Sequence, residues 1–344
     1  MSAASGGSAA APAASVGADP SAVLVIRPSS LGDIVHALAL VADIRRHRPE
    51  LAIDWVAEEP FVPLVALDPG VRRVIPIALR RWRHQFLAAA TWREAAAFRR
   101  DLRATRYAAI LDLQEQVKGA LVARLTRGVR HGPDRASIRE PVATLLHDLH
   151  HPIDRARHLI DRCRQLAGAA LGYAVDGPPV FGLVPPRATG DVITVGRRYV
   201  VAVHATSRAD KLWPEADWRR LVAAFGEGGC AVLLPWGSAE ERARSDRLAA
   251  GSPHAIVPPR QDLAAMAGLL ARADLVVGVD TGLVHLAAAL GTPTLAIFTV
   301  TDPALAGVER ASATARDLGG SGRVPGLEAV RAAADALALR APSR

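Results

Sequence analysis

Short apolar runs alternate with amphipathic segments along the first half of the chain. The apolar runs predict buried strands at 23–26, 52–56, 71–77 and 108–113, and helical spacing predicts helices at 34–47, 92–104, 117–127 and 153–171. A basic stretch at 80–84 interrupts this alternation and is predicted to be a loop. Because strands that alternate with helices favour parallel pairing, we expect a parallel sheet covered by helices on both faces.

The same alternation restarts after residues 174–198, a segment rich in proline and glycine that predicts a connection between domains. Strands are predicted at 199–203, 231–234, 275–279 and 294–298, and helices at 214–227, 239–250, 261–272, from 282 onwards and at 326–340. We therefore expect a disordered tail (1–20), a first α/β domain (21–173), a linker (174–198), a second α/β domain (199–325) and a C-terminal helix and tail (326–344). Ligands of open α/β sheets bind beyond the carboxyl ends of the strands, so the cleft between the domains is the expected binding site.

The charge balance indicates the kind of partner. Lysine and arginine number 42 against 34 aspartates and glutamates, and the formal net charge is +8. This excess favours an anionic partner, which includes nucleic acid, an anionic membrane surface and phosphorylated small molecules. Aromatic residues make up only 4% of the chain, too few for the stacking platforms that bind nucleic acid, so we expect no nucleic-acid partner.

Cysteine usage and hydropathy bear on the cellular compartment. Cys163 and Cys230 have no spacing typical of a disulfide framework or a metal site, which favours a reducing cytoplasm. No apolar run reaches the roughly 20 residues of a membrane-spanning helix. Residues 1–20 contain no lysine or arginine and therefore lack the charged start of a signal peptide. The histidine and acidic residues show no metal-ligand spacing, so neither a metal nor a cofactor is expected.

Lys211 lies in a polar loop between a predicted strand and a predicted helix. Lys211 and Lys118 are the only lysines among 42 basic residues, and Lys211 shares its loop with Thr206 and Ser207. Hydroxyl groups and a compact cation in a strand-to-helix loop suit a phosphate group. The alternative interpretation is a chance lysine in a solvated loop.

A second loop of similar character, residues 280–285, follows the predicted strand 275–279. Asp280, Thr281 and Gly282 lie where unpaired backbone amides and the helix dipole favour an anion, and His285 falls on the same first turn. A simple N-cap with a buried histidine is the alternative. Two such loops at one sheet edge favour phosphate binding. Neither loop has the Walker or the Gly-x-Gly-x-x-Gly pattern, which argues against an NTPase and a dehydrogenase.

Further charged residues are candidates for acid–base chemistry or ligand binding. Asp33, just inside the first predicted helix, is either a general base facing the cleft or a carboxylate that complements the helix dipole. Arg80, Arg81 and Arg83 form either a clamp for phosphate or carboxylate groups or a solvated basic loop. Glu241 could accept hydrogen bonds from a ribose, or complement the dipole of its own helix.

Several segments together resemble the lipopolysaccharide heptosyltransferases of glycosyltransferase family 9. The main ones are 29–36 (SSLGDIVH), 204–214 (HATSRADKLWP) and 279–285 (VDTGLVH). Segments 54–58 (DWVAE), 80–83 (RRWR), 132–134 (GPD) and 139–141 (REP) are also similar, and the order and spacing fit over residues 22–305. The chain departs from the family pattern at 299–300, where Thr-Val replaces Gly-Pro, at Gln261, where a methionine near the adenine is expected, and after residue 306.

The resemblance implies a glycosyltransferase-B architecture, in which two Rossmann-like domains face each other across a cleft. The N-terminal domain would bind the acceptor and the C-terminal domain the donor, ADP-L-glycero-D-manno-heptose. The implied activity is an inverting, metal-independent transfer of heptose to the Kdo of Kdo2-lipid A, in the biosynthesis of the lipopolysaccharide inner core. The protein would then work at the cytoplasmic face of the inner membrane, as a peripheral protein without an obligate protein partner.

The resemblance also implies roles for the candidate residues. Asp33 would deprotonate the acceptor hydroxyl, and Lys211 would hold the diphosphate and stabilise it as it leaves. Glu241 would bind the ribose, and Asp280 would contact the heptose hydroxyls. The implied donor-binding residues are Thr206, Ser207, Lys211, Glu241, Asp280, Thr281, Gly282 and His285, and the implied acceptor-binding residues are Ser30, Arg80, Arg81 and Arg83.

The sequence leaves two other functions as alternatives. One is a family member that acts on a later sugar of the lipopolysaccharide core. The other is a non-catalytic nucleotide-binding α/β protein, which would explain the positive charge but not an acid at position 33 facing the cleft.

Overall fold

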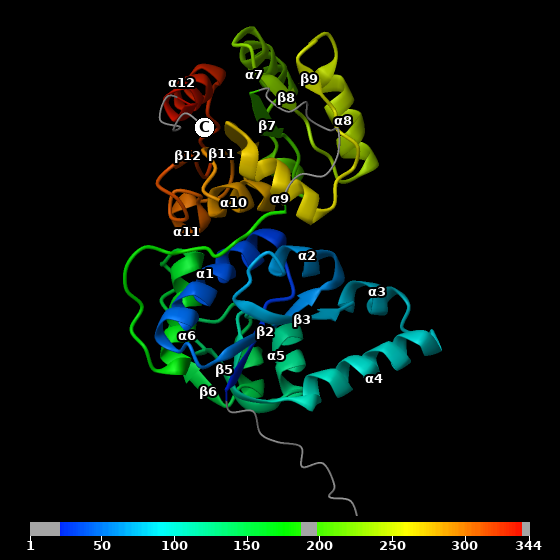
Figure 1. The fold of residues 1–344 in the computed structure, drawn as a ribbon, viewed down its shortest axis with the longest axis vertical. Coiled ribbons are helices and arrows are strands. Elements are labelled where there is room, and N and C mark those ends of the chain that lie inside the picture. Colours follow the sequence, from blue (N-terminus) through cyan, green and yellow to red (C-terminus); the bar gives the residue numbers. More distant parts are fainter. Residues whose placement is uncertain (1–20, 187–197, 339–344) are drawn as a thin grey trace, which may run out of the picture.

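The structure is a computed structural model that describes residues 21–186 and 198–338. The predicted tail (1–20), residues 187–197 of the predicted linker and the last residues (339–344) lie outside the described ranges. The described residues form two α/β units, one above the other in Figure 1, each built on a parallel sheet of its own.

The first sheet, within residues 21–186, has six parallel strands in the order β3-β2-β1-β4-β5-β6. The strands are β1 (Ala22–Ile26), β2 (Ala52–Glu58), β3 (Val71–Ile77), β4 (Arg106–Asp112), β5 (Arg127–Pro133) and β6 (Leu149–His151). Every residue of the central strand β1 is buried, as expected of a strand covered on both faces. The strand order reverses between β1 and β4, and ligands of open α/β sheets bind at such points.

The second sheet, within residues 198–338, has the order β12-β11-β10-β7-β8-β9 and is again parallel. The strands are β7 (Tyr199–Val203), β8 (Ala231–Leu233), β9 (Ala255–Ile256), β10 (Leu275–Val279), β11 (Thr294–Phe298) and β12 (Ala315–Gly319). Its order reverses between β7 and β10. Both sheets therefore have the strand order of a Rossmann fold, and the predicted fold class is confirmed.

Helices pack against both sheets (Figure 1). The first unit has α1 (Leu31–His47), α2 (Val62–Val65), α3 (Leu79–His84), α4 (Ala89–Ala104), α5 (Val117–Arg124) and α6 (Leu159–Leu171). The second unit has α7 (Glu215–Glu227), α8 (Ala239–Ala249), α9 (Leu263–Arg272), α10 (Gly282–Ala289), α11 (Pro303–Ala306) and α12 (Leu327–Ala338). No helix within the described ranges combines the length and apolar composition that crossing a bilayer requires.

The two units meet across a partly apolar interface. Helix α1 contacts α10, α2 contacts α9, and buried side chains of both units belong to one continuous hydrophobic cluster. Polar contacts join the units beside this cluster. Arg310 donates two hydrogen bonds of 2.9 and 2.6 Å to Asp161, and the His158 ring is 3.0 Å from the carbonyl oxygen of Gly307. The interface therefore brings the amino end of α1 against the amino end of α10.

The structure differs locally from the sequence prediction. Residues 80–84, predicted to be a loop, belong to the short helix α3, which begins after Ala78 without a capping side chain within the described residues. Helix α6 begins at Leu159 rather than at 153, because the His158 side chain caps it. The strands β5, β6, β9 and β12 are absent from the prediction. They lie toward the sheet edges and are short or carry polar residues, so they lack the apolar run of a buried strand.

A buried ion pair fastens α6 to α1. The Arg164 side chain, only 1% exposed, donates hydrogen bonds of 2.7 and 2.9 Å to the two carboxylate oxygens of Asp43. Its remaining donors reach the carbonyl oxygens of Asp176 and Gly177, at the start of the predicted linker. Removing one partner of such a pair leaves an uncompensated buried charge, which is strongly destabilising.

We expect Arg164→Ala to lower the free energy of unfolding by about 3–5 kcal/mol, because the Asp43 carboxylate loses its partner. The matched control is Arg46→Ala, since Arg46 pairs with Asp176 at 3.2 Å while its side chain is 65% exposed. That change should cost less than about 1 kcal/mol. Urea denaturation followed by circular dichroism measures both, and equal losses would contradict the prediction.

Candidate active site

A cavity of about 650 Å³ lies between the two units, at the carboxyl ends of β1, β7 and β10. It thus lies at the reversal points of both sheets, where the sequence places the binding site. Its lining includes Ser30, Asp33, His36 and Arg80 from the first unit, and Thr206, Ser207, Lys211, Glu241, Asp280, Thr281, Gly282 and His285 from the second. The structure therefore brings together every predicted donor-side residue with Asp33, Ser30 and Arg80.

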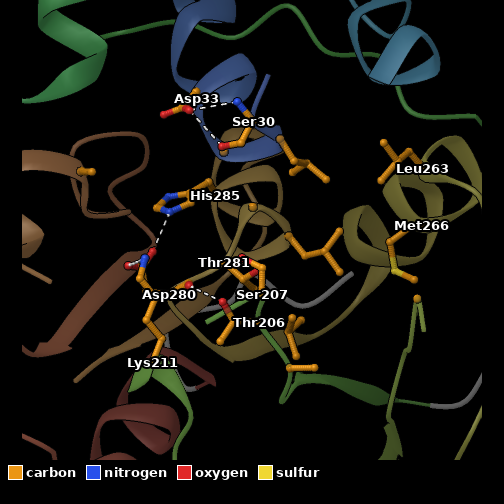
Figure 2. Close-up of a pocket in the computed structure, with 18 of the residues that line it drawn as sticks. Ser30, Asp33, Thr206, Ser207, Lys211, Leu263, Met266, Asp280, Thr281 and His285 are labelled. Carbon is orange, nitrogen blue, oxygen red and sulfur yellow. Dashed lines mark hydrogen bonds and ion pairs between the residues drawn. The ribbon is translucent and has the colours of Figure 1, made fainter. Parts of the chain in front are cut away.

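Asp280 is the centre of the polar contacts on the second unit's side of the cavity (Figure 2). Its carboxylate is 2.6 Å from the Lys211 ammonium, accepts a hydrogen bond of 2.6 Å from the Thr301 hydroxyl and is 3.3 Å from His285 Nε2. Burial opposes the charge on this carboxylate, but the contacts with His285, Lys211 and Thr301 outweigh burial and hold the pKa of Asp280 well below its usual range. Asp280 is therefore an ionised hydrogen-bond acceptor inside the cavity.

Lys211 is held in place by Asp280. Its side chain is 18% exposed and its ammonium group makes the 2.6 Å ion pair described above. An ammonium group carries three N–H donors, and this ion pair occupies one of them. Thr206 lies close by and donates a hydrogen bond of 3.4 Å to the Asp280 carbonyl oxygen. Lys211 can therefore donate to an anion in the cavity while it stays paired with Asp280.

The amino end of α10 opens onto the same cavity. Thr281 occupies the N-cap position, and within the described residues its hydroxyl makes no capping hydrogen bond, so it is available to a ligand. Gly282 is required by close packing, because a Cβ atom there would lie 2.8 Å from Leu31 Cβ and 2.9 Å from the backbone nitrogen of Gly32. The unpaired amides of a helix start and the positive end of its dipole make this place suitable for a phosphate group.

Asp33 faces the cavity from the first turn of α1. The Ser30 backbone nitrogen and hydroxyl each donate a hydrogen bond of 2.9 Å to Asp33 Oδ2, and an Arg27 guanidinium nitrogen is 3.1 Å from Asp33 Oδ1. Burial acts to raise the pKa of Asp33, but Arg27 and the Ser30 hydrogen bonds outweigh it and lower that pKa. Asp33 therefore serves as a helix-capping carboxylate and also presents an ionised oxygen to the cavity, so the two interpretations of this residue are compatible.

The three arginines of α3 do not share one environment. Arg80 lines the cavity. Arg81 instead pairs with Glu59 at 3.0 Å and with Glu94 at 2.8 Å. Arg83 is exposed at the surface and is not among the residues that line the cavity. The structure therefore separates a set that the sequence predicts to act together, since adjacent residues of a helix point in different directions.

Glu241 lies at the cavity but already has a local role. Its Oε2 atom accepts hydrogen bonds from the backbone nitrogens of Gly237 at 2.6 Å and Ser238 at 3.2 Å, and the Ser238 hydroxyl accepts one from the Glu241 nitrogen. This reciprocal capping box starts α8. Glu241 therefore stabilises the start of its own helix, and its Oε1 atom is left as the acceptor for a ligand.

The sequence prediction missed residues beside Asp33. Arg27, at the end of β1, also donates to the carbonyl oxygen of Leu113. Lys118 reaches the Ser29 hydroxyl at 3.4 Å, and burial together with Arg80 lowers the pKa of its ammonium group. The rarity of lysine was a signal for Lys118, but nothing in the sequence places the start of α5 beside the loop that precedes α1. In the described residues no group of three or more His, Cys, Asp or Glu side chains is arranged to hold a metal ion.

Comparison with known proteins places this chain in a family. A family model described as glycosyltransferase family 9 (heptosyltransferase) matches residues 95–320. Lipopolysaccharide heptosyltransferase 1 of Salmonella typhimurium is 40% identical over 296 residues, which cover 83% of this chain and 90% of that protein. The match extends over both α/β units.

Solved structures give the same result. The E. coli heptosyltransferase WaaC with ADP is similar with a TM-score of 0.84 and 35% identity, over 92% of this chain and 99% of that one. WaaC with ADP-2-deoxy-2-fluoro heptose is similar with a TM-score of 0.77 and 35% identity, over 90% and 98% of the two chains. By sequence and by structure, the chain belongs to glycosyltransferase family 9, the heptosyltransferase family.

Proposed function

We propose that this chain transfers L-glycero-D-manno-heptose from ADP-heptose to the Kdo of Kdo2-lipid A, as an inverting and metal-independent glycosyltransferase. The observation that carries the proposal is the cavity itself, in which an ionised carboxylate on α1 faces an anion-suited helix start on α10. Support for the donor comes from the similar structures, which contain ADP and a heptose analogue. Support for the first heptose, rather than a later one, comes from the 40% identical relative named heptosyltransferase 1.

The second unit would bind the donor. The diphosphate would lie at the amino end of α10, on Thr281 and Gly282, within reach of the Lys211 ammonium, with Thr206 and Ser207 supplying hydroxyls. The negative charge that develops on the leaving ADP would be stabilised by Lys211 and the helix dipole. Glu241 Oε1 would accept from the ribose, and the ionised Asp280 would accept from a heptose hydroxyl.

The first unit would bind and activate the acceptor. Asp33 would take the proton of the Kdo hydroxyl as that oxygen attacks the anomeric carbon of the heptose and the bond to the diphosphate breaks. Ser30 and Arg27 hold the Asp33 carboxylate in position for this transfer. Because base and diphosphate approach from opposite units, the attack would be in line and would invert the anomeric centre. Arg80 and Lys118 would meet the carboxylates of the acceptor.

We also propose that the protein binds the membrane peripherally through the turn between α3 and α4. Phe86 and Leu87 in this turn and Trp92 near the start of α4 are 59%, 85% and 66% exposed, so three large apolar side chains within residues 86–92 face solvent. Arg83 and Arg93 are exposed beside them. Apolar and aromatic side chains next to arginines suit the interface of an anionic bilayer. Since Arg80 of the same α3 lines the cavity, this turn would hold the lipid-anchored acceptor near its site.

Incubation with ADP-heptose and Kdo2-lipid A, followed by mass spectrometry of the lipid, tests the proposed reaction. We expect the lipid to gain the mass of one heptose. A gain seen only with an acceptor that already carries heptose would instead assign the chain to a later step. No gain with either acceptor would refute the proposed transfer.

We expect Asp33→Asn to lower kcat by about 10²–10⁴-fold, because an amide cannot take the acceptor proton. The dissociation constant of ADP-heptose, measured by calorimetry, should change only a few-fold, since the donor site lies on the other unit. Glu328→Gln is the matched control, because Glu328 is also an acid in a first helical turn but lies in α12. Near-normal turnover of the Asp33 variant would exclude it as the base.

We expect the double variant Phe86→Ser, Leu87→Ser to lose binding to phosphatidylglycerol vesicles in a sedimentation assay, because burial of apolar surface drives insertion. Its activity on a soluble, deacylated Kdo disaccharide should be unchanged. Val324→Ser, at a residue of the second unit that is 56% exposed, is the control and should bind vesicles like the unaltered protein. Equal vesicle binding by all three proteins would contradict the assignment.

A further inference from the structure

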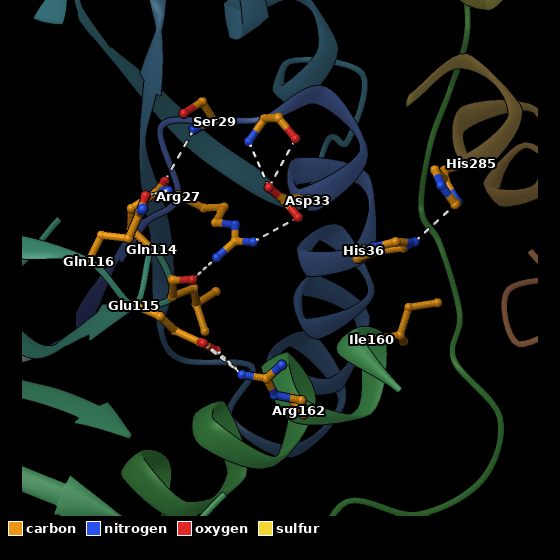
Figure 3. A network of polar contacts seen from close by, with 12 residues as sticks. Arg27, Ser29, Asp33, His36, Gln114, Glu115, Gln116, Ile160, Arg162 and His285 are labelled. Carbon is orange, nitrogen blue, oxygen red and sulfur yellow. Dashed lines mark hydrogen bonds and ion pairs between the residues drawn. The ribbon is translucent and has the colours of Figure 1, made fainter. Parts of the chain in front are cut away.

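A continuous chain of polar contacts crosses the boundary between the two units. The Lys211 ammonium is 2.6 Å from Asp280 Oδ2, and Asp280 Oδ1 is 3.3 Å from His285 Nε2. The other ring nitrogen, His285 Nδ1, is 3.2 Å from Nε2 of His36. His36 lies on α1, one helical turn after Asp33, and points toward His285 (Figure 3). This series of contacts, from Lys211 to His36, therefore ends on α1, the helix that carries the proposed base.

The protons of this chain can be placed by hydrogen-bond chemistry. Asp280 is ionised and can only accept, so His285 Nε2 carries the proton between them. In the singly protonated form of His285 that carries its proton on Nε2, Nδ1 is an acceptor and His36 Nε2 donates to it. His36 Nδ1 is buried and has no hydrogen-bond partner among the described residues, which fits an unprotonated nitrogen, because a buried N–H left without an acceptor costs more. The N–H of His36 therefore donates to His285, and the N–H of His285 donates to Asp280.

The environment of His36 keeps it in this neutral state. The residue is 3% exposed, and its ring packs at 4.5 Å from the His285 ring and at 5.5 Å from the His158 ring. Burial lowers the pKa of His36 well below its usual range. His36 is therefore a neutral donor, and a second proton would add a buried N–H without a partner.

The His36–His285 contact forms only when α1 of the first unit packs against α10 of the second. A Cβ atom on Gly32 would lie 3.2 Å from the His285 ring, so the ring packs directly on the first turn of α1. Among the described residues, four side chains make polar contacts with Asp280: Lys211, Thr301 and His285 hold its carboxylate, and Thr206 bonds its carbonyl oxygen. Of the three side chains that hold the carboxylate, His285 is the one held by a residue of the opposite unit, His36.

We propose that His36 is a positioning residue that acts through His285 on Asp280. Through this contact the Asp280 carboxylate takes its orientation only when α1 lies against α10. The inference rests on the proposed role of Asp280 toward the heptose. His36 touches no reacting atom in the proposed reaction. By holding the tautomer and orientation of His285, it links the placement of Asp33 to the placement of Asp280.

The inference predicts a selective effect on the sugar part of the donor. In His36→Leu the ring of His285 loses its donor, so the affinity for ADP-heptose should fall about tenfold, the effect of one hydrogen bond. The affinity for ADP, which lacks the heptose, should change much less. His36→Gln keeps an N–H donor at the same reach and should restore most of the difference. Calorimetry with ADP and with ADP-heptose measures the ratio of the two affinities.

His158→Leu is the matched control. His158 is also a buried histidine at the boundary, but its Nε2 atom bonds the Gly307 carbonyl and it makes no hydrogen bond to the His36–His285–Asp280 chain among the described residues. It should leave the ratio of affinities unchanged. If His36→Leu also leaves the ratio unchanged while Asp280→Asn reduces it, the inference is overturned and the proposed function stands. If Asp280→Asn has no effect on the ratio, the proposed donor role of Asp280 fails and the inference fails with it.

Nitrogen NMR of the unaltered protein gives a second test that does not depend on folding of the variants. Specifically labelled histidine should show His285 with a proton on Nε2 and a bare Nδ1, and His36 with a proton on Nε2. A His285 protonated on Nδ1 would overturn the inference, because His36 could then no longer donate to it.

Discussion

The site depends on one packing constraint, the contact between the amino ends of α1 and α10. These helices follow the central strands β1 and β10 of two different sheets, and their first turns meet where Gly32 and Gly282 leave room. A Cβ atom at Gly282 would lie 2.9 Å from the Gly32 nitrogen and would push the units apart, and one at Gly32 would press on the His285 ring at 3.2 Å. Because both helices start at the cavity, the same contact sets the distance between the Asp33 carboxylate and the anion-suited end of α10.

Two carboxylates of the cavity, Asp33 and Asp280, are each held by several polar neighbours. Asp33 is held by Arg27 and Ser30, and Asp280 by Lys211, Thr301 and His285. Such pairing offsets the cost of burying charge and fixes each side chain in one orientation. A ligand would therefore meet preorganised groups, as the proposed reaction requires. In the proposed reaction, binding and chemistry would use the same contacts that stabilise the fold.

The sequence predicted the elements whose pattern lies in contiguous residues. The buried strands β1, β7 and β10 and the loops after them were predictable, because an apolar run and its flanking polar residues lie close together in the chain. The strands β5 and β12 were not, since their polar residues lie near sheet edges. Helix α3 was missed because it is short and begins without a capping side chain within the described residues.

By itself, the sequence determined the two α/β units, the family resemblance and the two loops that carry Lys211 and Asp280. Each of these features depends on contiguous residues, because strand propensity, helix starts and motif spacing are local properties of the sequence. Only the tertiary structure decided that Lys211 is paired with Asp280, that Lys118 lies beside Ser29, and that His36 meets His285 from the other unit. The physical reason is that these contacts join residues far apart in the chain, and their distances follow from strand order and from the packing of α1 on α10.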